Sequence, residues 1–388
     1  MADDEPVAKK VKLDEGTAAN DAVSIRIVKD AKDWSGQPTF HPAFTYHAFG
    51  KDEVIRGYQG LCIMLTFNAN TFDCFVEVTF DHRDTDADDV MAMMEHSLPK
   101  GFTQDKEAFL HALEHSAAKP PGALVNSYTK DDKEFATYFA VLSEDAAAAA
   151  YLDRMQKLSL WFIEGADDID VHDARWSLYV VFDVSAGYLH PAGYITMFTF
   201  HAPMTMMQNV RICQVLVLPP YQRQGHGERL VEYIMHQARS RANVHEVTVE
   251  DPVPGFSTLR DVVDVKTCLS HGFFGLPPSE ATASAGHGTR ALTPDDVAAV
   301  KKSLKVTKTQ VHRCYEILKL RFVDRTNEPE YKAFRLEVKR RLHSLHMEDL
   351  DAMGSADRRK GLLATLYEAL EADYDRVLGR CGLLARPE

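Results

Sequence analysis

Residues 212–230 read ICQVLVLPPYQRQGHGERL, and this stretch decides the fold. Its first half is typical of an apolar β-strand, which Pro219 and Pro220 bring to an end. A turn with two glycines follows, and then a helix begins. Such a turn directs free backbone N–H groups and the positive end of a helix dipole at one point. The stretch therefore predicts a binding site for a pyrophosphate group.

The turn does not match the two common nucleotide-binding loops. A dinucleotide-binding fingerprint needs a third small residue so that helix and strand pack closely, and Leu230 stands at that position. A P-loop needs Gly-Lys followed by Ser or Thr, which is missing here. A turn that only links a strand to a helix remains the alternative, because short glycine patterns often match by chance. The triplet recurs at 286–288 without a preceding strand, and we expect that copy to be linker.

Composition limits the class of protein. The 388 residues are 45% hydrophobic and 26% charged, as in an ordinary globular protein with two or three domains. The net charge of −13 argues against direct binding of nucleic acid and favours a basic partner or substrate. No apolar run is long enough for a transmembrane helix, and no signal-peptide core is present. We therefore expect no association with a membrane.

Cysteine usage and the N-terminal residues bear on the compartment. The cysteines form no C-x-x-C pair, which predicts buried free thiols in a reducing compartment; they are Cys62, Cys74, Cys213, Cys268, Cys314 and Cys381. Residues 1–22 are polar and non-periodic, which predicts a disordered tail. Within that tail, residues 6–14 resemble a monopartite nuclear localisation signal, with a solvated run of charges as the alternative. These features predict a protein of the nucleus and cytoplasm.

Hydrophobic patterning divides the rest of the chain into three parts: a mixed α/β domain at 23–125, a second domain at 126–282 and a helical domain at 283–388. Strands are predicted at 61–67, 74–80, 161–164, 177–183, 193–200 and 245–250, and a helix is predicted at 146–157. In the helix after the glycine turn, Leu230, Val231, Ile234 and Ala238 share one face that we expect to pack on the sheet. Residues 277–291 form a predicted linker, and Thr293 with Pro294 predicts the start of a helix.

Two acidic residues end the strand that follows the turn. A lysine has a pKa of about 10.4, so about one in 10³ is a free amine at pH 7, and any group transfer to such an amine needs a proton acceptor. Partly desolvated, neighbouring carboxylates are suited to this role. Glu250 and Asp251 form such a pair, and Glu164 closes another predicted strand. A solvated strand end is the alternative interpretation.

Taken together, these motifs resemble a known family. The pattern Gln222-x-x-Gly225-x-Gly227 is similar to the acyl-coenzyme A loop of the GNAT superfamily of N-acetyltransferases. From about residue 25 to about 345, the chain resembles type B histone acetyltransferase catalytic subunits in blocks of matching order and spacing. The blocks are Phe49-Gly50 to Tyr58-Gln59-Gly60, Trp161 to Glu164, Gly225 to Gly227, Glu250 to Pro252, Leu259 to Asp261 and Tyr315 to Leu318.

The resemblance implies an α+β fold: a GNAT acetyltransferase with a central mixed sheet, an N-terminal mixed domain and a C-terminal helical domain. It also implies acetyl transfer from acetyl-CoA, without a metal, to tail lysines of free, newly synthesised histone H4. Glu250 would be the general base, with Glu164 and Asp251 beside it. Coenzyme contacts would come from Val215, Leu216, Val217, Gln222, Arg223, Gln224, Gly225, His226 and Gly227. Tail contacts would come from Asp52, Glu53, Trp176, Phe198 and Phe200, and a WD-repeat histone-binding subunit would be the partner.

The chain departs from the family pattern at some positions. Arg223 replaces a small or neutral residue, and Phe198 and Phe200 stand where tyrosines are expected, which removes hydrogen-bonding options for the tail. After Glu250 no tyrosine is found to protonate the leaving thiolate. His343 and His346 lack a third metal ligand. Two alternatives stay open: an acetyltransferase for protein N-termini or small amines, and a non-catalytic histone-binding module.

Overall fold

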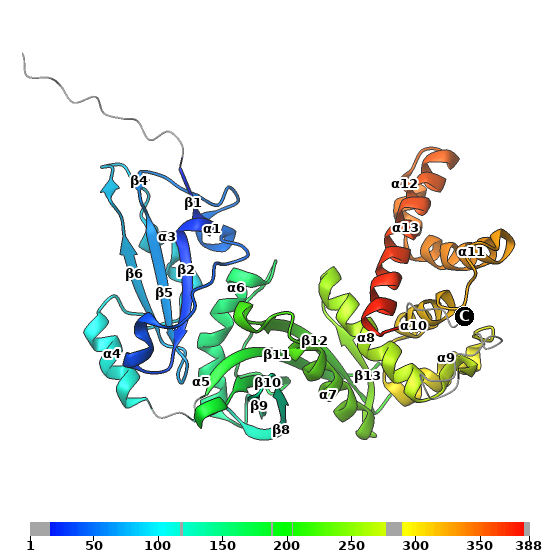
Figure 1. Ribbon diagram of the computed structural model, residues 1–388, viewed down its shortest axis with the longest axis horizontal. Helices are drawn as coiled ribbons and strands as arrows, with labels where there is room; N and C mark the ends of the chain where they lie inside the picture. The colour runs from blue at the N-terminus through cyan, green and yellow to red at the C-terminus, as the bar shows by residue number, and fades with distance from the viewer. Residues whose placement is uncertain (1–15, 117–118, 188, 204, 277–288, 384–388) are drawn as a thin grey trace, which may run out of the picture. The chain divides into compact units, whose positions relative to one another are not determined.

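The computed structural model describes residues 16–383, except 117–118, 188, 204 and 277–288 (Figure 1). By its internal contacts the chain divides into two units. The first comprises Met1–Phe198 and Cys213–His226, and the second comprises Thr199–Ile212 and Gly227–Glu388. The localisation-signal motif at 6–14 and most of the predicted linker lie outside the described residues.

The first unit begins with a three-stranded sheet of order β2-β5-β6 (Figure 1). Its strands are β2 (Val23–Val28), β5 (Cys62–Asn68) and β6 (Cys74–Thr79), so the two strands predicted here are confirmed. Val28 and Phe75 pack with Phe109 and Leu113 of α4 (Lys106–His115), which covers this sheet. Short elements complete this part: β1 (Thr17–Ala18), α1 (Ala19–Ala22), α2 (Tyr46–Phe49), β3 (Val54–Ile55), β4 (Tyr58–Gln59), β7 (His82–Arg83) and α3 (Val90–Met94).

The prediction of a disordered tail up to residue 22 is wrong for its last residues. Thr17 and Ala18 pair with Ile55 and Val54, and Ala19 and Ala22 are buried. Small alanine side chains fit under the sheet without the long apolar pattern that identifies a core segment in a sequence. The prediction of disorder from composition was therefore wrong for residues 17–22.

A six-stranded sheet of order β13-β12-β11-β10-β9-β8 follows. Its strands are β8 (Ala123–Lys130), β9 (Lys133–Val141), β10 (Trp176–Asp183), β11 (His190–His201), β12 (Gln208–Val217) and β13 (Val244–Val249). The β12–β13 pair is parallel, while β8–β9, β9–β10 and β10–β11 are antiparallel. The sheet is mixed, as expected for the α+β class. The helices α5 (Ala146–Met155) and α6 (Ser159–Phe162) precede β10.

The strand predicted at 161–164 is wrong. Trp161 and Phe162 end helix α6, and Glu164 lies in the turn that follows. A short run of apolar residues does not distinguish a buried strand from a buried helical turn. Trp161 is 1% exposed and belongs to the core.

The second unit is mainly helical. Its helices are α7 (His226–Ser240), α8 (Pro254–Ser270), α9 (Pro294–Leu304), α10 (Lys308–Leu320), α11 (Glu328–Leu345), α12 (Met347–Ala352) and α13 (Ala356–Arg380). The predicted start at Thr293 is confirmed, since its side chain and that of Asp296 form a capping box. Leu230, Val231, Ile234 and Ala238 of α7 are all buried, also as predicted.

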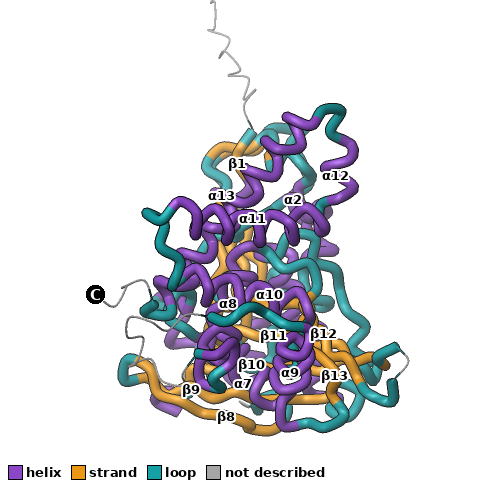
Figure 2. The backbone as a smooth tube through the Cα atoms, turned by 90° about the vertical axis from the view of Figure 1, so that its right-hand side faces the viewer, coloured by secondary structure: helices purple, strands orange, loops and turns teal. Residues whose placement is uncertain are grey.

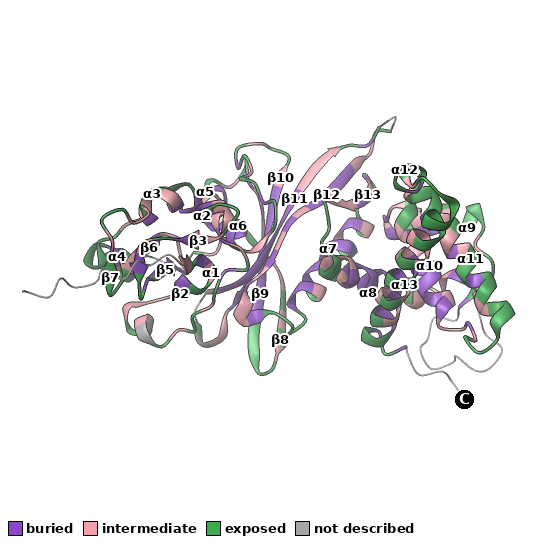
Figure 3. Ribbon diagram, turned by 90° about the horizontal axis from the view of Figure 1, so that it is seen from above, coloured by how far each residue is buried: buried purple, intermediate pink, exposed green. Residues whose placement is uncertain are grey.

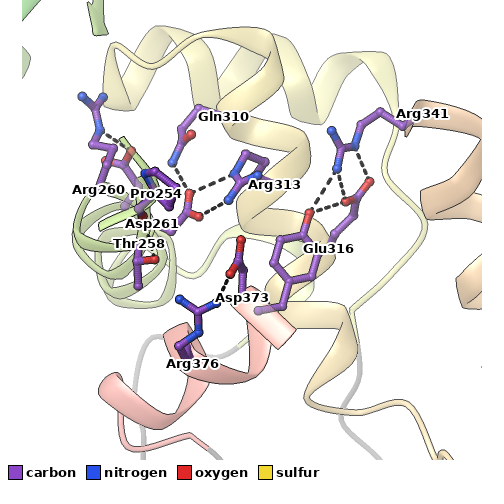
Figure 4. A network of polar contacts seen from close by, with 12 residues as sticks. Pro254, Thr258, Arg260, Asp261, Gln310, Arg313, Glu316, Arg341, Asp373 and Arg376 are labelled. Carbon is purple, nitrogen blue, oxygen red and sulfur yellow. Dashed lines mark hydrogen bonds and ion pairs between the residues drawn. The ribbon is translucent and has the colours of Figure 1, made fainter. Parts of the chain in front are cut away.

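Helices α8, α10, α11 and α13 pack against one another in this unit (Figure 2). A buried ion pair holds three of them: Arg341 of α11 donates through Nε and Nη2 to Glu316 of α10 at 2.7 Å each, and Tyr374 of α13 donates to Glu316 at 2.6 Å (Figure 4). The outer sides of α12 and α13 are largely exposed (Figure 3). The bundle is therefore fastened by polar contacts as well as by its apolar core.

Four of the cysteines are buried free thiols, as predicted, but Cys62 is exposed and Cys213 is partly exposed. Among the described residues, no helix has the length and apolar character needed to span a membrane.

Candidate active site

The loop that joins β12 to α7 is built from its own side chains. Gln222 donates through Nε2 to the carbonyl of Val217 at 2.9 Å, and Gln224 donates through Nε2 to the carbonyl of Pro220 at 2.8 Å. Residues 222–225 are all exposed, and α7 begins directly after them. Because the first N–H groups of a helix have no acceptor within it, they are available to an anion at this point.

Two residues of the loop adopt a left-handed backbone. Gly225 has φ of 87°, and Arg223 has φ of 61°. Glycine takes this conformation without strain, whereas arginine does so at some cost. No atom lies within 4 Å of the position that a Cβ on Gly225 would occupy, so the space above the loop is open. These residues therefore fit a phosphate-bearing group that approaches the backbone closely.

The buried side chain of His226 holds the end of the loop in place. This side chain is 2% exposed, its Nδ1 shares a hydrogen bond of 2.7 Å with the phenol of Tyr128, and its ring centroid lies 4.4 Å from that of Phe135. The imidazole thus packs into the first unit, while the backbone N–H of His226 belongs to the helix start. Sequence reasoning missed Tyr128, because strand β8 carries no motif that connects it with the loop.

A second polar group supports the loop at Tyr221. Its hydroxyl lies 3.2 Å from Nδ1 of His190 and 3.4 Å from a carboxylate oxygen of Asp183, which pairs with Lys133 at 3.1 Å. Burial lowers the pKa of His190, so its ring is neutral at pH 7. Burial would raise the pKa of Asp183, but hydrogen bonds from Ser185 and Lys133 outweigh it and hold that pKa below its usual range. The contacts of Tyr221 with His190 and Asp183 thus hold the chain in place just after the end of β12.

Strand β12 presents alternate residues to solvent just before the loop. Val215 and Val217 are partly exposed, whereas Gln214 and Leu216 are buried. A Cβ on Gly193 of β11 would lie 2.5 Å from the carbonyl oxygen of Leu216, so only glycine permits this approach of the two strands.

Gln214 ties the segment after α6 to β12. It donates through Nε2 to the carbonyl of Asp167 at 2.9 Å, and Tyr194 donates to its Oε1 at 3.2 Å. Glu164 lies three residues before Asp167, on an exposed turn where the N–H of Gly165 donates to the phenol oxygen of Tyr46 at 2.8 Å. The segment that carries Glu164 is thus held within the first unit by contacts that no sequence motif indicated.

The acidic pair lies at the end of β13, in the second unit. The N–H of Glu250 donates to the carbonyl of Ile212 at 2.9 Å, where the β12–β13 pairing stops. The carboxylate of Glu250 is 47% exposed and lies 3.3 Å from the guanidinium of Arg211, which stacks over the ring of Phe200 at 5.1 Å. Asp251 is exposed and has a left-handed backbone, with φ of 32°. The sequence did not indicate the contact with Arg211.

The start of α7 is also tied to the C-terminal helix. Glu228, in the first turn of α7, accepts from Lys266 of α8 at 2.8 Å and from Arg380 at the end of α13 at 3.1 Å. An acidic residue at this point also interacts favourably with the helix dipole. The last turn of α13 therefore supports the first turn of α7.

Comparison with known proteins agrees with this geometry. Residues 16–164 match the family described as "Histone acetyl transferase HAT1 N-terminus", and residues 131–254 match the family described as "Acetyltransferase (GNAT) family". The histone acetyltransferase type B catalytic subunit of Mus musculus is 30% identical over 396 residues, which cover 93% of this chain and 93% of the relative. The subunit of the same name from Kluyveromyces lactis is 30% identical over 387 residues, with coverages of 95% and 93%.

The chain belongs to the family of type B histone acetyltransferase catalytic subunits. Its fold is that of the GNAT acetyltransferases, and its enzymatic class is acetyl-CoA-dependent acetyltransferase. The loop at 222–227 and the acidic turn at 250–251 are accordingly the two parts of this type B acetyltransferase in which to seek coenzyme binding and proton transfer.

The residues expected to contact the tail in this acetyltransferase lie in different settings. Trp176 and Phe198 are cross-strand partners on β10 and β11, with ring centroids 4.8 Å apart. Asp52 is exposed, but the carboxylate of Glu53 accepts hydrogen bonds from the N–H and the hydroxyl of Thr45 at the start of α2. Of these two acids, Glu53 is thus already engaged in holding α2.

Within the described residues no group of three or more metal-ligating side chains occurs.

Proposed function

We propose that this protein transfers the acetyl group of acetyl-CoA to lysines in the N-terminal tail of free, newly synthesised histone H4. The observation that carries the proposal is the strand–loop–helix junction at 217–227, exposed at 222–225, in a chain of this family. The net charge of −13 supports it, because a histone tail is strongly basic.

The loop residues fit a coenzyme. In the proposal, the N–H groups at the start of α7 and the backbone of 222–227 bind the pyrophosphate, and the backbone of 215–217 binds the adjoining amides. The bound thioester supplies an activated acetyl group. The chain itself has to orient the lysine and remove a proton from its ammonium group, since only the neutral amine attacks.

Glu250 is the proposed proton acceptor, with Asp251 and Glu164 as supporting acids. The carboxylate of Glu250 is accessible to an incoming ammonium group, and a lysine can replace Arg211 as its cationic neighbour. Asp52, Trp176, Phe198 and Phe200 are the proposed tail contacts, with Glu53 in a structural role beside them. Each of these residues is accessible at least in part.

Replacement of the proposed base tests the mechanism. In Glu250→Gln, kcat should fall by about 10²- to 10⁴-fold between pH 6 and 9, while coenzyme affinity stays near that of the wild type. Glu246→Gln is the matched control, because Glu246 lies on the same strand and pairs with Lys301 at 3.4 Å. Turnover of Glu250→Gln equal to that of the control would remove Glu250 from the role.

A second experiment tests the acceptor. Incubation with labelled acetyl-CoA and a mixture of histone tails, peptides with free N-termini and small amines, followed by mass spectrometry, separates the two kinds of acceptor that remain open. Label on H4 lysines supports the proposal, and label on N-termini or small amines without label on H4 lysines supports the broader GNAT alternative. We further propose a WD-repeat histone-binding partner and a location in nucleus and cytoplasm. Co-purification and imaging of the tagged protein test these.

A further inference from the structure

Helix α11 carries positive charge in an otherwise acidic chain. The protein has a net charge of −13, yet residues 331–345 of this helix contain five Lys and Arg residues and one acidic residue. Arg341 pairs with the buried Glu316. Glu337 pairs with Lys319 of α10 at 2.6 Å. Four cations of the helix are left over: Lys332, Arg335, Lys339 and Arg340.

These four cations are accessible and lack a carboxylate of their own. In the described part of the chain, no carboxylate oxygen lies within 4.0 Å of their charged nitrogens. Lys332, Arg335 and Lys339 follow one another at spacings of three and four residues, so they share one side of the helix. With the exposed Leu336 and His343, they form what we call the cationic face of α11. This face extends over about three turns, or about 16 Å.

Two cations of this face lie on the same aromatic ring. The guanidinium carbon of Arg335 is 5.7 Å from the ring centre of Tyr367 on α13, and Nζ of Lys339 is 5.4 Å from that ring centre. Arg335 also lies 5.4 Å from the ring centre of Tyr331. Tyr367 is 2% exposed, so its ring forms a buried base on which both charges rest. The packing of α13 thus holds two positive charges close together at the surface.

The two charges disfavour each other. Like charges four positions apart on a helix are destabilising, and burial together with the charge of Arg335 lowers the pKa of Lys339 below its ordinary value of 10.5. The acids of α13 nearby compensate only in part. Glu368 acts on Lys339 from an exposed position, without an ion pair in the residues that the structure describes. Glu371 is held by the hydroxyl of Tyr331 at 2.7 Å. Negative charge from outside the chain would therefore relieve the repulsion.

The chemistry of the cationic face fits an acidic protein segment better than a nucleic acid. Proteins that bind single strands stack the bases on open aromatic rings, whereas the ring of Tyr367 is buried beneath the cations. Leu336 lies among the charges and is 47% exposed, and a phosphate backbone offers no apolar group to cover it. An amphipathic helix with carboxylates three and four residues apart and an apolar side chain between them matches both the charges and the leucine.

We propose that the cationic face of α11 binds an acidic amphipathic helix of a partner protein. Carboxylates of the partner pair with Lys332, Arg335 and Lys339, and an apolar side chain of the partner packs on Leu336. The face belongs to the second unit and shares no residue with the loop at 222–227 or the acidic turn. The inference therefore goes beyond the proposed function and does not depend on it.

Reversal of two charges tests the face. The probe is a fluorescently labelled helical peptide of about 18 residues, with Glu at spacings of three and four and Leu between them. Arg335→Glu combined with Lys339→Glu should weaken its binding at least about tenfold in fluorescence anisotropy at low salt. Arg358→Glu combined with Lys360→Glu is the matched control, because both residues are exposed on the first turns of α13 and the change in net charge is the same. Equal affinity of the two double variants would overturn the inference.

A milder variant guards against loss of the fold. Arg335→Gln combined with Lys339→Gln removes both charges but keeps long side chains over Tyr367, and relief of the repulsion should leave the melting temperature close to that of the wild type. We expect this variant to bind the acidic peptide about fivefold more weakly than the wild type, and unchanged binding would contradict the proposal.

Two further measurements identify the kind of partner. Affinity of the wild type for the acidic peptide should fall as the salt concentration rises from about 50 to 300 mM, because exposed charges are screened. A peptide with Ser in place of each Leu should bind more weakly, as it leaves Leu336 uncovered. DNA that binds this face more tightly than the acidic peptide would overturn the inference in favour of a nucleic-acid site. A wild-type protein that does not bind the acidic peptide would overturn it as well.

Discussion

Nδ1 of His226 lies 2.7 Å from the phenol oxygen of Tyr128, although 98 positions separate the two residues in the chain. This contact joins β8, at the edge of the large sheet, to the first residue of the helix that follows the loop at 222–225. The geometry of the loop therefore depends on a residue far outside the motif that identified it.

Tyr128→Phe should weaken this support. Loss of one partly buried hydrogen bond should lower the free energy of unfolding by about 1 kcal/mol, and we expect coenzyme affinity to fall about three- to tenfold because the loop is less well ordered. Urea unfolding and calorimetry with coenzyme A measure the two effects. Tyr138→Phe on β9 is the control, because it also removes a phenol hydroxyl from the large sheet. The ring of Tyr138 packs on that of Phe182, with centroids 5.8 Å apart, and not on His226. Equal coenzyme affinity in both variants would show that the contact does not shape the loop.

His190 should make stability depend on pH. Burial lowers its pKa below the ordinary value of 6.5, so the unfolded chain takes up this proton before the folded protein does. The stabilisation is thus complete above about pH 6.5 and is lost as the pH falls below it. In His190→Gln, urea unfolding between pH 7.5 and 5 should show a shallower loss of stability. Asp183 does not contribute to this pH dependence. Its pKa in the folded protein is below the ordinary carboxylate value of 3.8, so its stabilising effect is lost only when the pH falls below that value.

Gly227→Asp should abolish coenzyme binding in calorimetry. The new carboxylate would meet the pyrophosphate at the start of α7, where negative charge is otherwise favourable to the helix. Gly361→Asp is the control, since it adds the same charge to α13 at a glycine with open space around it. If Gly227→Asp binds coenzyme as well as the control does, the loop is not the coenzyme site.

Glu316→Gln should destabilise the helical bundle. The carboxylate is 4% exposed and is held by Arg341 and Tyr374, so removal of its charge leaves a largely buried guanidinium, 16% exposed, uncompensated. We expect a loss of about 3–5 kcal/mol in the free energy of unfolding. Asp357→Asn is the control, because Asp357 is 97% exposed and lies 4.0 Å from Lys360. Two variants of equal stability in urea unfolding would contradict this role.

Strong periodicity made much of the fold predictable. The apolar run at 177–183 marked β10, the alternation within 245–250 marked β13, and the apolar face at Leu230 and Val231 marked α7. The same approach failed at 161–164, where four residues are too few to separate strand from helix. It also failed at 17–22, where alanines are buried without an apolar pattern.

Sequence reasoning selected candidate site residues only where they form a local motif. The loop at 222–227 has such a motif, because its glycines and glutamines lie within a few residues of one another. Arg211, Tyr128 and Asp183 do not, since each meets its partner through strand pairing between distant segments. A single sequence holds no signal of that pairing.

The contact between Arg380 and Glu228 has a genetic consequence. A premature stop codon just before position 380 would spare both family-matched regions and every residue of the loop and the acidic turn, and would still remove a contact of the first turn of α7. Cys381 and Leu383, which are also buried, would be lost with it. A nonsense allele at this position should therefore behave as a loss-of-function allele and not as a silent truncation.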